Sequence, residues 1–375
     1  ALAANTTGSQ NVAVGYNTLT ANTTINNMTA VGTDAFASNT SGDKGVAIGF
    51  AALTANTTAV HNTAVGFQAL TANTTGGNNT AVGKNALDAN TTATNNTALG
   101  VDAAGANTTG TRNVAVGALA LSSNTTANDN VAVGGGTASV SFAALNSNTT
   151  GTFNTAVGNG ALGANTTASE NTALGYSALL DNTTGESNTA LGKDALRANT
   201  TGSNNVAVGI DALTLNTTGG GNVVIGASAG QDLTTGSNNT FAGVRAGQNI
   251  TTADGNVAIG VDAMEDTTTG AANTCIGNNA GNNITTGSNN SCIGKESGKS
   301  GGPGGTLTGG SNRIILGNSS IGELNCQVAL SVASDERDKT DFTALDLGLD
   351  FVKQMKPYTY KWDKRHKYVD WDKNP

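Results

Sequence analysis

Apolar residues recur along this chain with a fixed period of seventeen, inside a phrase that is otherwise small and polar. Residues 62–78 read NTAVGFQALTANTTGGN, and aligning the copies on the glycine that follows Ala-Val gives eighteen repeats. The phase breaks only twice, between Gly134 and Gly158 and between Gly294 and Gly317. A period of this length predicts a stacked architecture in which each repeat is one coil that cannot bury its apolar side alone.

We number the positions of a coil from its first asparagine, so that Asn62 is position one of the copy at 62–78. Positions one to four predict a short strand. Position four is Val, Ile or Leu in seventeen copies and Ala242 in the other, so we expect it to face a packed interior. Position three is usually Ala and points to the opposite face. Because a strand that is apolar on both faces is buried on both, we expect the Ala face to lie against neighbouring copies of the chain.

Position five is Gly in all eighteen copies, which indicates a corner that needs positive φ or a close backbone approach. Positions eight and nine, Ala69 and Leu70, supply the second apolar contact. The Asn-Thr-Thr-Gly run at 73–76 has turn chemistry, and stacked Asn and Thr side chains are expected to hydrogen-bond between coils.

A second repeat type occurs after Gly226. In three copies the Ala-Leu pair at positions eight and nine becomes Ala-Gly, and in the same copies the turn Asn at position twelve becomes Leu233, Ile250 or Ile284. We infer that positions nine and twelve border one pocket, which needs one large aliphatic side chain from either of them.

These patterns predict an all-β fold: an elongated parallel β-solenoid or β-roll of 17-residue coils, homotrimeric, with a short α+β appendage at the C-terminus. Eighteen coils at ~4.8 Å per rung give a rod of about 85 Å. The expected divisions are a shaft at 1–317, with insertions near 135–141 and 299–311, a connecting strand at 318–333, and an appendage at 334–375. Replacing Ala98 by a large charged residue is expected to disrupt the trimer.

Composition and charge limit the kind of core that the chain can form and the classes of partner that it can bind. With 37% hydrophobic and 4% aromatic residues and 51 Gly, the chain suits a thin core better than a single globular one. The net charge of −8 does not favour nucleic acid. No apolar run of eighteen residues is present, so no membrane span is expected. The chain opens in the middle of a repeat, and we expect it to be a fragment.

Motifs for chemistry are few. Cys275 and Cys292 both occupy position three in adjacent coils; a bridge is sterically conceivable, but we interpret them as small buried residues in place of Ala. His61 and His366 have no ligand partners at metal spacing, so we expect no metal and no cofactor. The Asn-Thr-Thr triplets match the glycosylation sequon, yet turn chemistry explains their recurrence.

Position six, directly after the corner glycine, is aromatic in some copies and Lys in others, which indicates a half-exposed edge. Such a stripe is a candidate contact for a glycan or a surface receptor, although partial burial explains it equally well. Phe142, which comes directly after the first insertion, is added to this group because insertions in solenoids map to loops that often carry contacts. An insertion that is tolerated without any partner explains this segment at least as well. The candidate binding residues are Tyr16, Phe50, Phe67, Phe142 and Tyr176.

The last 42 residues change in composition, with both Trp residues and a predicted helix from 341 to 355. Here SDERDK at 334–339, with KPYTYKW after it at 356–362, resembles the start of the self-cleaving intramolecular chaperone domain found at the C-termini of phage tail fibres and tail spikes. The repeats are similar to those of such fibres, and more distantly to the head repeats of trimeric autotransporter adhesins. We expect 334–375 to be the truncated start of the chaperone domain.

The resemblance implies a chaperone that trimerises the fibre and then releases itself by cleavage at the motif serine, assisted by a lysine five residues on. Ser334 and Lys339 occupy those positions. The expected protein is the structural shaft of a bacteriophage tail fibre, located in the virion and involved in host attachment. It is no enzyme apart from this single-turnover autoproteolysis. Its expected partners are its own copies, other virion proteins and a host surface receptor such as a glycan.

Two other functions compete with this one. A bacterial trimeric surface adhesin, located at the cell surface, has similar repeats, and a membrane anchor in place of a chaperone at the C-terminus would distinguish it. Ice binding through threonine ladders needs a flat paired array of Thr side chains. Adjacent residues such as Thr74 and Thr75 diverge, so the sequence argues against it.

Overall fold

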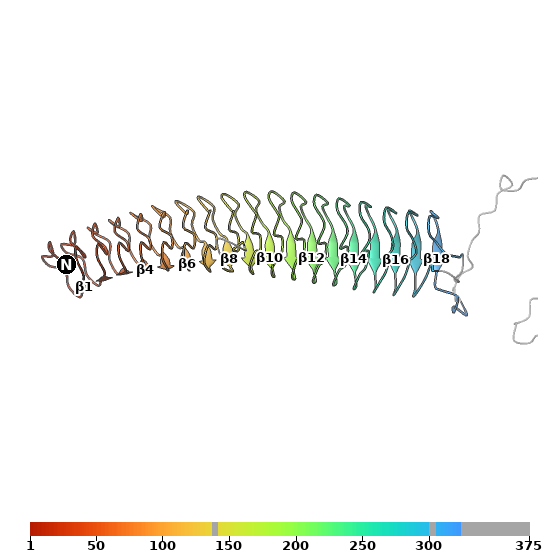
Figure 1. Cartoon of the computed structure of the whole chain (residues 1–375), viewed down its shortest axis with the longest axis horizontal. Helices are drawn as coiled ribbons and strands as arrows, with labels where there is room; N and C mark the ends of the chain where they lie inside the picture. Colours follow the sequence, from red (N-terminus) through yellow and green to blue (C-terminus); the bar gives the residue numbers. More distant parts are fainter. Residues whose placement is uncertain (137–141, 300–304, 324–375) are drawn as a thin grey trace, which may run out of the picture. The chain divides into compact units, whose positions relative to one another are not determined.

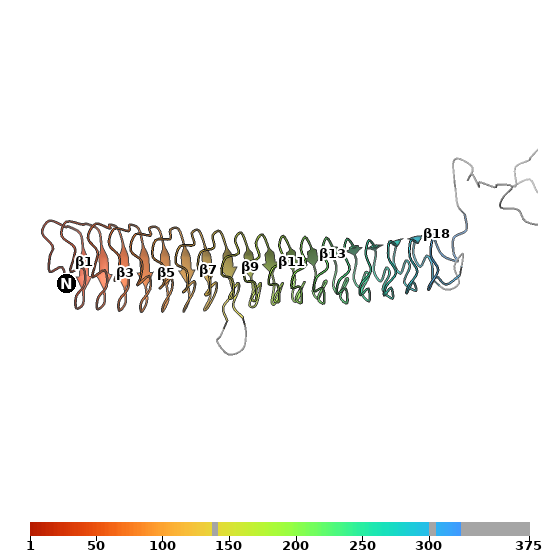
Figure 2. The ribbon, with the colours of Figure 1, turned by 90° about the horizontal axis from the view of Figure 1, so that it is seen from above.

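The computed structural model describes residues 1–136, 142–299 and 305–323, and residues 1–322 form one compact unit. Its described residues contain eighteen strands of three residues each and no helix. Each strand spans positions two to four of a coil, and the coils stack along one axis (Figure 1, Figure 2). The strands are β1 (Val12–Val14), β2 (Thr29–Val31), β3 (Val46–Ile48), β4 (Thr63–Val65), β5 (Thr80–Val82), β6 (Thr97–Leu99), β7 (Val114–Val116), β8 (Val131–Val133), β9 (Thr155–Val157), β10 (Thr172–Leu174), β11 (Thr189–Leu191), β12 (Val206–Val208), β13 (Val223–Ile225), β14 (Thr240–Ala242), β15 (Val257–Ile259), β16 (Thr274–Ile276), β17 (Ser291–Ile293) and β18 (Ile314–Leu316).

Every strand pairs in parallel with the strand of the next coil, and equivalent positions lie opposite each other, as in Ala64 with Ala81. The register survives both insertions: Val131 pairs with Thr155 across the first, and Ser291 pairs with Ile314 across the second. The predicted all-β parallel solenoid of 17-residue coils is therefore confirmed.

The two faces of each strand are the reverse of those predicted. Position three lies inside the coil, where Ala64 and its equivalents from Ala30 onward are fully or almost fully buried, whereas position four points outward in all eighteen strands. The physical reason is the thinness of the coil. In most coils the interior is already filled by Ala at position eight and Leu at position nine, so opposite them there is room for little more than a methyl group. Larger residues such as Phe241 fit at position three where position nine is Gly.

The corner glycine at position five behaves as predicted. Gly66 has a φ of +145°, and a Cβ on it would run into the carbonyl oxygen of Gly83 in the next coil. The same approach recurs along the stack, so this position requires both the conformation and the size of glycine.

Positions seven, nine and seventeen also adopt left-handed backbone, which the sequence did not reveal. In the coil at 62–78 the φ angles are +56° at Gln68, +52° at Leu70 and +60° at Asn78. A bulky residue such as Leu rarely adopts this conformation. Burial of the leucine side chain in the coil interior offsets the backbone cost, since burying a Leu is worth about 1.5–3 kcal/mol.

Glycine at position nine makes room for neighbouring side chains. A Cβ on Gly247 would meet the ring of Phe241 at 2.9 Å, and one on Gly281 would meet Cδ1 of Ile284 at 3.0 Å and collide with Sγ of Cys275. Positions nine and twelve therefore border one pocket, as inferred, and position three is its third border.

Two ladders of buried asparagine run along the stack. At position twelve, Asn73 Nδ2 donates to Asn56 Oδ1 at 3.1 Å and to the carbonyl of Gly76 at 2.9 Å. At position one, the backbone N–H of Asn79 donates to Asn62 Oδ1 at 2.8 Å. These bonds satisfy polar groups that would be costly to bury unpaired, and they confirm the expected ladders.

Candidate functional site

The outward side of the sheet has an apolar side chain at position four on every rung, and a Thr, Val, Ile or Ser at position two. We call the side chains at positions two and four of every coil the outer sheet face. At position four none is buried, and Val14, Leu99 and Ile225 have 58%, 48% and 48% of their surface exposed. The other exposed members at position four are Ile48, Leu174, Leu191, Ile259, Ile276, Ile293 and Leu316. Because the strands are in register, these side chains form a continuous strip.

A strip of this kind marks an interaction surface. Soluble monomers rarely expose contiguous apolar patches larger than a few hundred Å², and here Val, Ile or Leu recurs at nearly every rung. The parallel order also gives the strip a regular spacing of ~4.8 Å. A partner with the same period would match it rung for rung.

The five aromatic residues predicted as contacts all lie at position six, one residue beyond the corner glycine. Their exposed fractions range from 46% at Phe50 and Phe67 to 79% at Tyr16. The rings of Phe50 and Phe67 stack with centroids 5.3 Å apart and an interplanar angle of 13°. Tyr16 lies two coils before Phe50.

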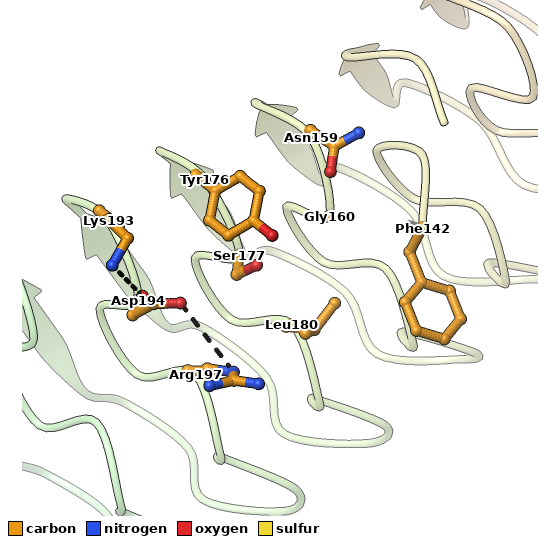
Figure 3. A pocket seen from close by; sticks show the side chains of 9 residues that line it. All are labelled: Phe142, Asn159, Gly160, Tyr176, Ser177, Leu180, Lys193, Asp194 and Arg197. Carbon is orange, nitrogen blue, oxygen red and sulfur yellow. Dashed lines mark ion pairs between the residues drawn. The ribbon is translucent and has the colours of Figure 1, made fainter. Parts of the chain in front are cut away.

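Phe142 takes position six in spite of the preceding insertion. Its carbonyl accepts from the backbone N–H of Gly160 at 2.8 Å, just as that of Phe50 accepts from Gln68 at 2.9 Å. Two coils further along, Tyr176 occupies the equivalent place. The structure therefore brings two of the five candidates, Phe142 and Tyr176, to one pocket (Figure 3).

This pocket has a volume of about 320 Å³. Besides the two aromatic residues it is lined by Asn159, Gly160, Ser177, Leu180, Lys193, Asp194 and Arg197. Sequence reasoning missed it. The available signal was the glycine pair Gly160 and Gly163, because no other coil of the described stack has glycine at both position seven and position ten.

A charged cluster lies at one end of the pocket. Lys193 Nζ lies 2.8 Å from Asp194 Oδ2, and Arg197 Nε lies 3.9 Å from Asp194 Oδ1 (Figure 3). The hydrogen bond to Asp194, with the charges of Asp194 and Asp211, raises the pKa of the Lys193 ammonium above its ordinary value. Lys193 therefore stays charged at neutral pH.

Other candidates lie elsewhere. Ser334, Lys339 and His366 fall outside the described residues. His61 lies at position seventeen with a φ of +58°. In the part of the chain that the structure describes, no group of three or more His, Cys, Asp or Glu residues is placed to hold a metal ion, and no helix is long and apolar enough to cross a membrane.

The fold and the outer sheet face define a repeat protein, a parallel β-solenoid with a strip of exposed apolar side chains along its sheet. Comparison with known families adds a second element: residues 334–374 match the family model described as the chaperone of endosialidase. The match begins at Ser334 and covers the segment for which a resemblance was predicted, so that resemblance is confirmed. No curated protein and no solved structure matches the chain.

Proposed function

We propose that this chain is the shaft of a bacteriophage tail fibre, a homotrimer whose stacked coils form a stiff spacer for host attachment. The observation that carries the proposal is the continuous outer sheet face, in a chain whose residues 334–374 match a chaperone of endosialidase. Chaperones of this family act in trimerisation. The outer sheet face supplies a surface for assembly, and the chaperone segment supplies a domain that brings three chains together.

The outer sheet face suits association between copies of the same chain. Three identical stacks placed in parallel around an axis present equal residues at equal height, so each apolar rung meets its own equivalents. Covering a half-exposed Val, Ile or Leu is worth about 1 kcal/mol. Repeated along the rungs of three chains, this small contribution becomes large enough to hold the fibre together.

The chaperone match also favours a fibre over the alternative of a bacterial surface adhesin. The outer sheet face by itself suits both, because both are built as trimers of stacked coils. An adhesin is expected to continue beyond Pro375 into a membrane anchor, whereas a fibre is expected to continue into the rest of the chaperone. The coding sequence downstream of Pro375 separates the two.

We further propose that Ser334 and Lys339 carry out one round of self-cleavage in the protein with its complete C-terminus. A serine hydroxyl becomes a strong nucleophile when a base takes its proton. A lysine serves as that base when neighbouring cations or burial lower its pKa. Arg337 acts in this direction, while Glu336 and Asp338 oppose it, so the assembled chaperone has to complete the site.

Two measurements test the proposal. Sedimentation of the full chain is expected to give a trimer, and a stable, well-folded monomer would refute the assembly. Expression with the complete C-terminus is expected to give a shortened chain in the wild type and an unprocessed trimer in the Ser334→Ala variant. Normal processing of that variant would eliminate the cleavage proposal and leave the shaft proposal standing.

A further inference from the structure

We propose that the pocket between Phe142, Tyr176 and Arg197 binds an uncharged sugar unit of a glycan. The inference rests on the proposed function and deepens its host-attachment part, since it names the chemistry that the shaft recognises. Its geometry depends on one chain alone. The lining residues come from positions six, seven and ten of successive coils, and none belongs to the outer sheet face.

The pocket exists because one coil lacks a side chain at position seven. Position seven is Gln68, Asn85 or Asp102 in three of the other coils, but here it is Gly160, and position ten of the same coil is Gly163. A Cβ on Gly160 would lie 3.4 Å from Leu180 Cδ1, and one on Gly163 would lie 2.7 Å from Phe142 Cβ. The missing side chain at Gly160 thus leaves a hollow, while the one missing at Gly163 lets Phe142 pack closely against the same coil.

The sides of the hollow are apolar and exposed. Phe142 and Tyr176 have 49% and 54% of their surface exposed, and Leu180, from the same coil as Tyr176, is half-buried between the coils. Figure 3 shows these three side chains around Gly160. Aromatic rings at a wet surface combine a flat apolar face with tolerance for polar neighbours, which suits the C–H face of a sugar ring.

The far end of the hollow supplies both donors and acceptors. Asp194 offers carboxylate oxygens, Lys193 an ammonium and Arg197 a guanidinium, and among the described residues Asp194 is the one ionic partner of Arg197. A sugar hydroxyl both donates and accepts, so adjacent hydroxyls can bridge such a mixed set. A small pocket with an apolar body and a few convergent polar groups is typical of a small-ligand site.

The charge balance favours an uncharged ligand. The two cations already face Asp194, and Asp211 lies close enough to Lys193 to contribute to its raised pKa. An anionic sugar would have to compete with these carboxylates and would meet their repulsion. A neutral ring replaces water at the cluster without disturbing the ion pairs.

The test uses the full chain and a panel of free sugars: glucose, galactose, mannose, N-acetylglucosamine and their common disaccharides, with glucuronate and N-acetylneuraminate as acidic members. Saturation-transfer NMR identifies ligands and calorimetry measures affinity. We expect at least one neutral sugar to bind with a dissociation constant of ~1 mM or tighter. Failure of every neutral sugar to bind below ~10 mM, or tighter binding of an acidic one, would overturn the proposal.

Variants locate the site. Gly160→Asn should fill the hollow and weaken binding at least tenfold. It is compatible with the fold because Asn85 occupies the same coil position with a φ of +54°, against +74° at Gly160, and because the added Cβ meets no atom closer than 3.4 Å. Tyr176→Ala should weaken binding similarly by removing the aromatic side.

Val261→Ala is the matched control, since it removes an exposed apolar side chain from position six far from the pocket, and it should bind as the wild type does. Unchanged binding in Gly160→Asn would place the sugar elsewhere and refute the site. Sedimentation of the same samples keeps the two proposals apart: a monomeric wild type that binds sugar would refute the trimeric shaft, while a trimer without sugar binding would refute only the pocket.

Discussion

Ala98 and Leu99 are neighbours in strand β6, and the smaller of the two is the one inside. Ala98 is fully buried, whereas 48% of the surface of Leu99 is exposed. The coil interior is narrow, so the larger side chain faces outward at this rung and at the other rungs with Ala at position three. In β14 position nine is Gly247, and there the larger Phe241 lies inside. Adjacent residues of the strand therefore have different roles. Ala98 packs inside its own coil, whereas Leu99 is available for contact with a partner.

The first prediction separates the two faces. Ala98→Asp should unfold the coils around β6, because an unpaired charge in the coil interior costs several kcal/mol. A triple variant, Leu99→Asp with Leu174→Asp and Leu191→Asp, should keep its β-structure but shift from trimer to monomer. In the proposed trimer the added charges of different chains face one another and repel. Circular dichroism and sedimentation measure the two effects. Trimers as stable as the wild type in the triple variant would contradict the proposed interface.

The second prediction concerns the corner glycines. Gly66→Ala should destabilise the stack by about 3 kcal/mol or more, because it combines an unfavourable φ with a collision against the next coil. Gly255→Asn is the control: Gly255 has a φ of +68° and no atom within 4 Å of its added Cβ, and other coils have Asn at this position. Denaturant unfolding should show a shifted midpoint in the first variant alone.

The third prediction tests the pocket shared by positions nine and twelve. Leu87→Gly leaves a cavity at a cost of about 2–5 kcal/mol. Asn90→Ile removes the hydrogen bond to Asn73 Oδ1 and overpacks the interior. The double variant recreates the arrangement of Gly281 and Ile284, so it should be destabilised by less than the sum, with a coupling of about 1 kcal/mol or more. Strict additivity of the unfolding free energies would show that the positions are independent.

The fourth prediction concerns Cys275 and Cys292, which are register partners in β16 and β17 and are both fully buried. The hydrogen bond between the thiols and their burial raise the pKa of Cys275 well above its ordinary value, so its reactive thiolate is scarce in the folded protein. Iodoacetamide at pH 8 should label both residues only after denaturation, because in the folded stack burial keeps the reagent away from either sulfur. Peptide mapping checks this, and fast labelling of either residue in the native protein would contradict it.

The sequence predicted the coil, its strand and its obligatory corner because each depends on local pattern. Period-two alternation also showed that residues such as Val65 and Ala64 face opposite sides. It did not show which side is inside, since that depends on the width of a cavity built by positions eight and nine of the same coil. The larger side chain at position four was expected to be the one inside the coil, and this expectation was wrong.

The candidate pocket was harder to predict from the sequence than the buried face of the strands. Phe142 and Tyr176 were visible as aromatic residues, but the hollow between them comes from the side chain that is missing at Gly160. Recognising it requires knowing that positions six, seven and ten of successive coils lie on one surface. The roles of Ser334 and Lys339 stay predictions, because both lie outside the described residues.

The burial of the asparagine ladder at position twelve also limits the cell compartments in which the newly made chain can fold. Twelve of its asparagines, from Asn22 to Asn216, begin a sequon, and in the folded stack each is fully buried. A cell compartment that attaches glycans to growing chains would modify these residues before the coils close, and a bulky hydrophilic glycan has no place in the interior. A eukaryotic secretory pathway should therefore yield glycosylated chains that fail to fold, whereas a bacterial cytoplasm should yield the native rod.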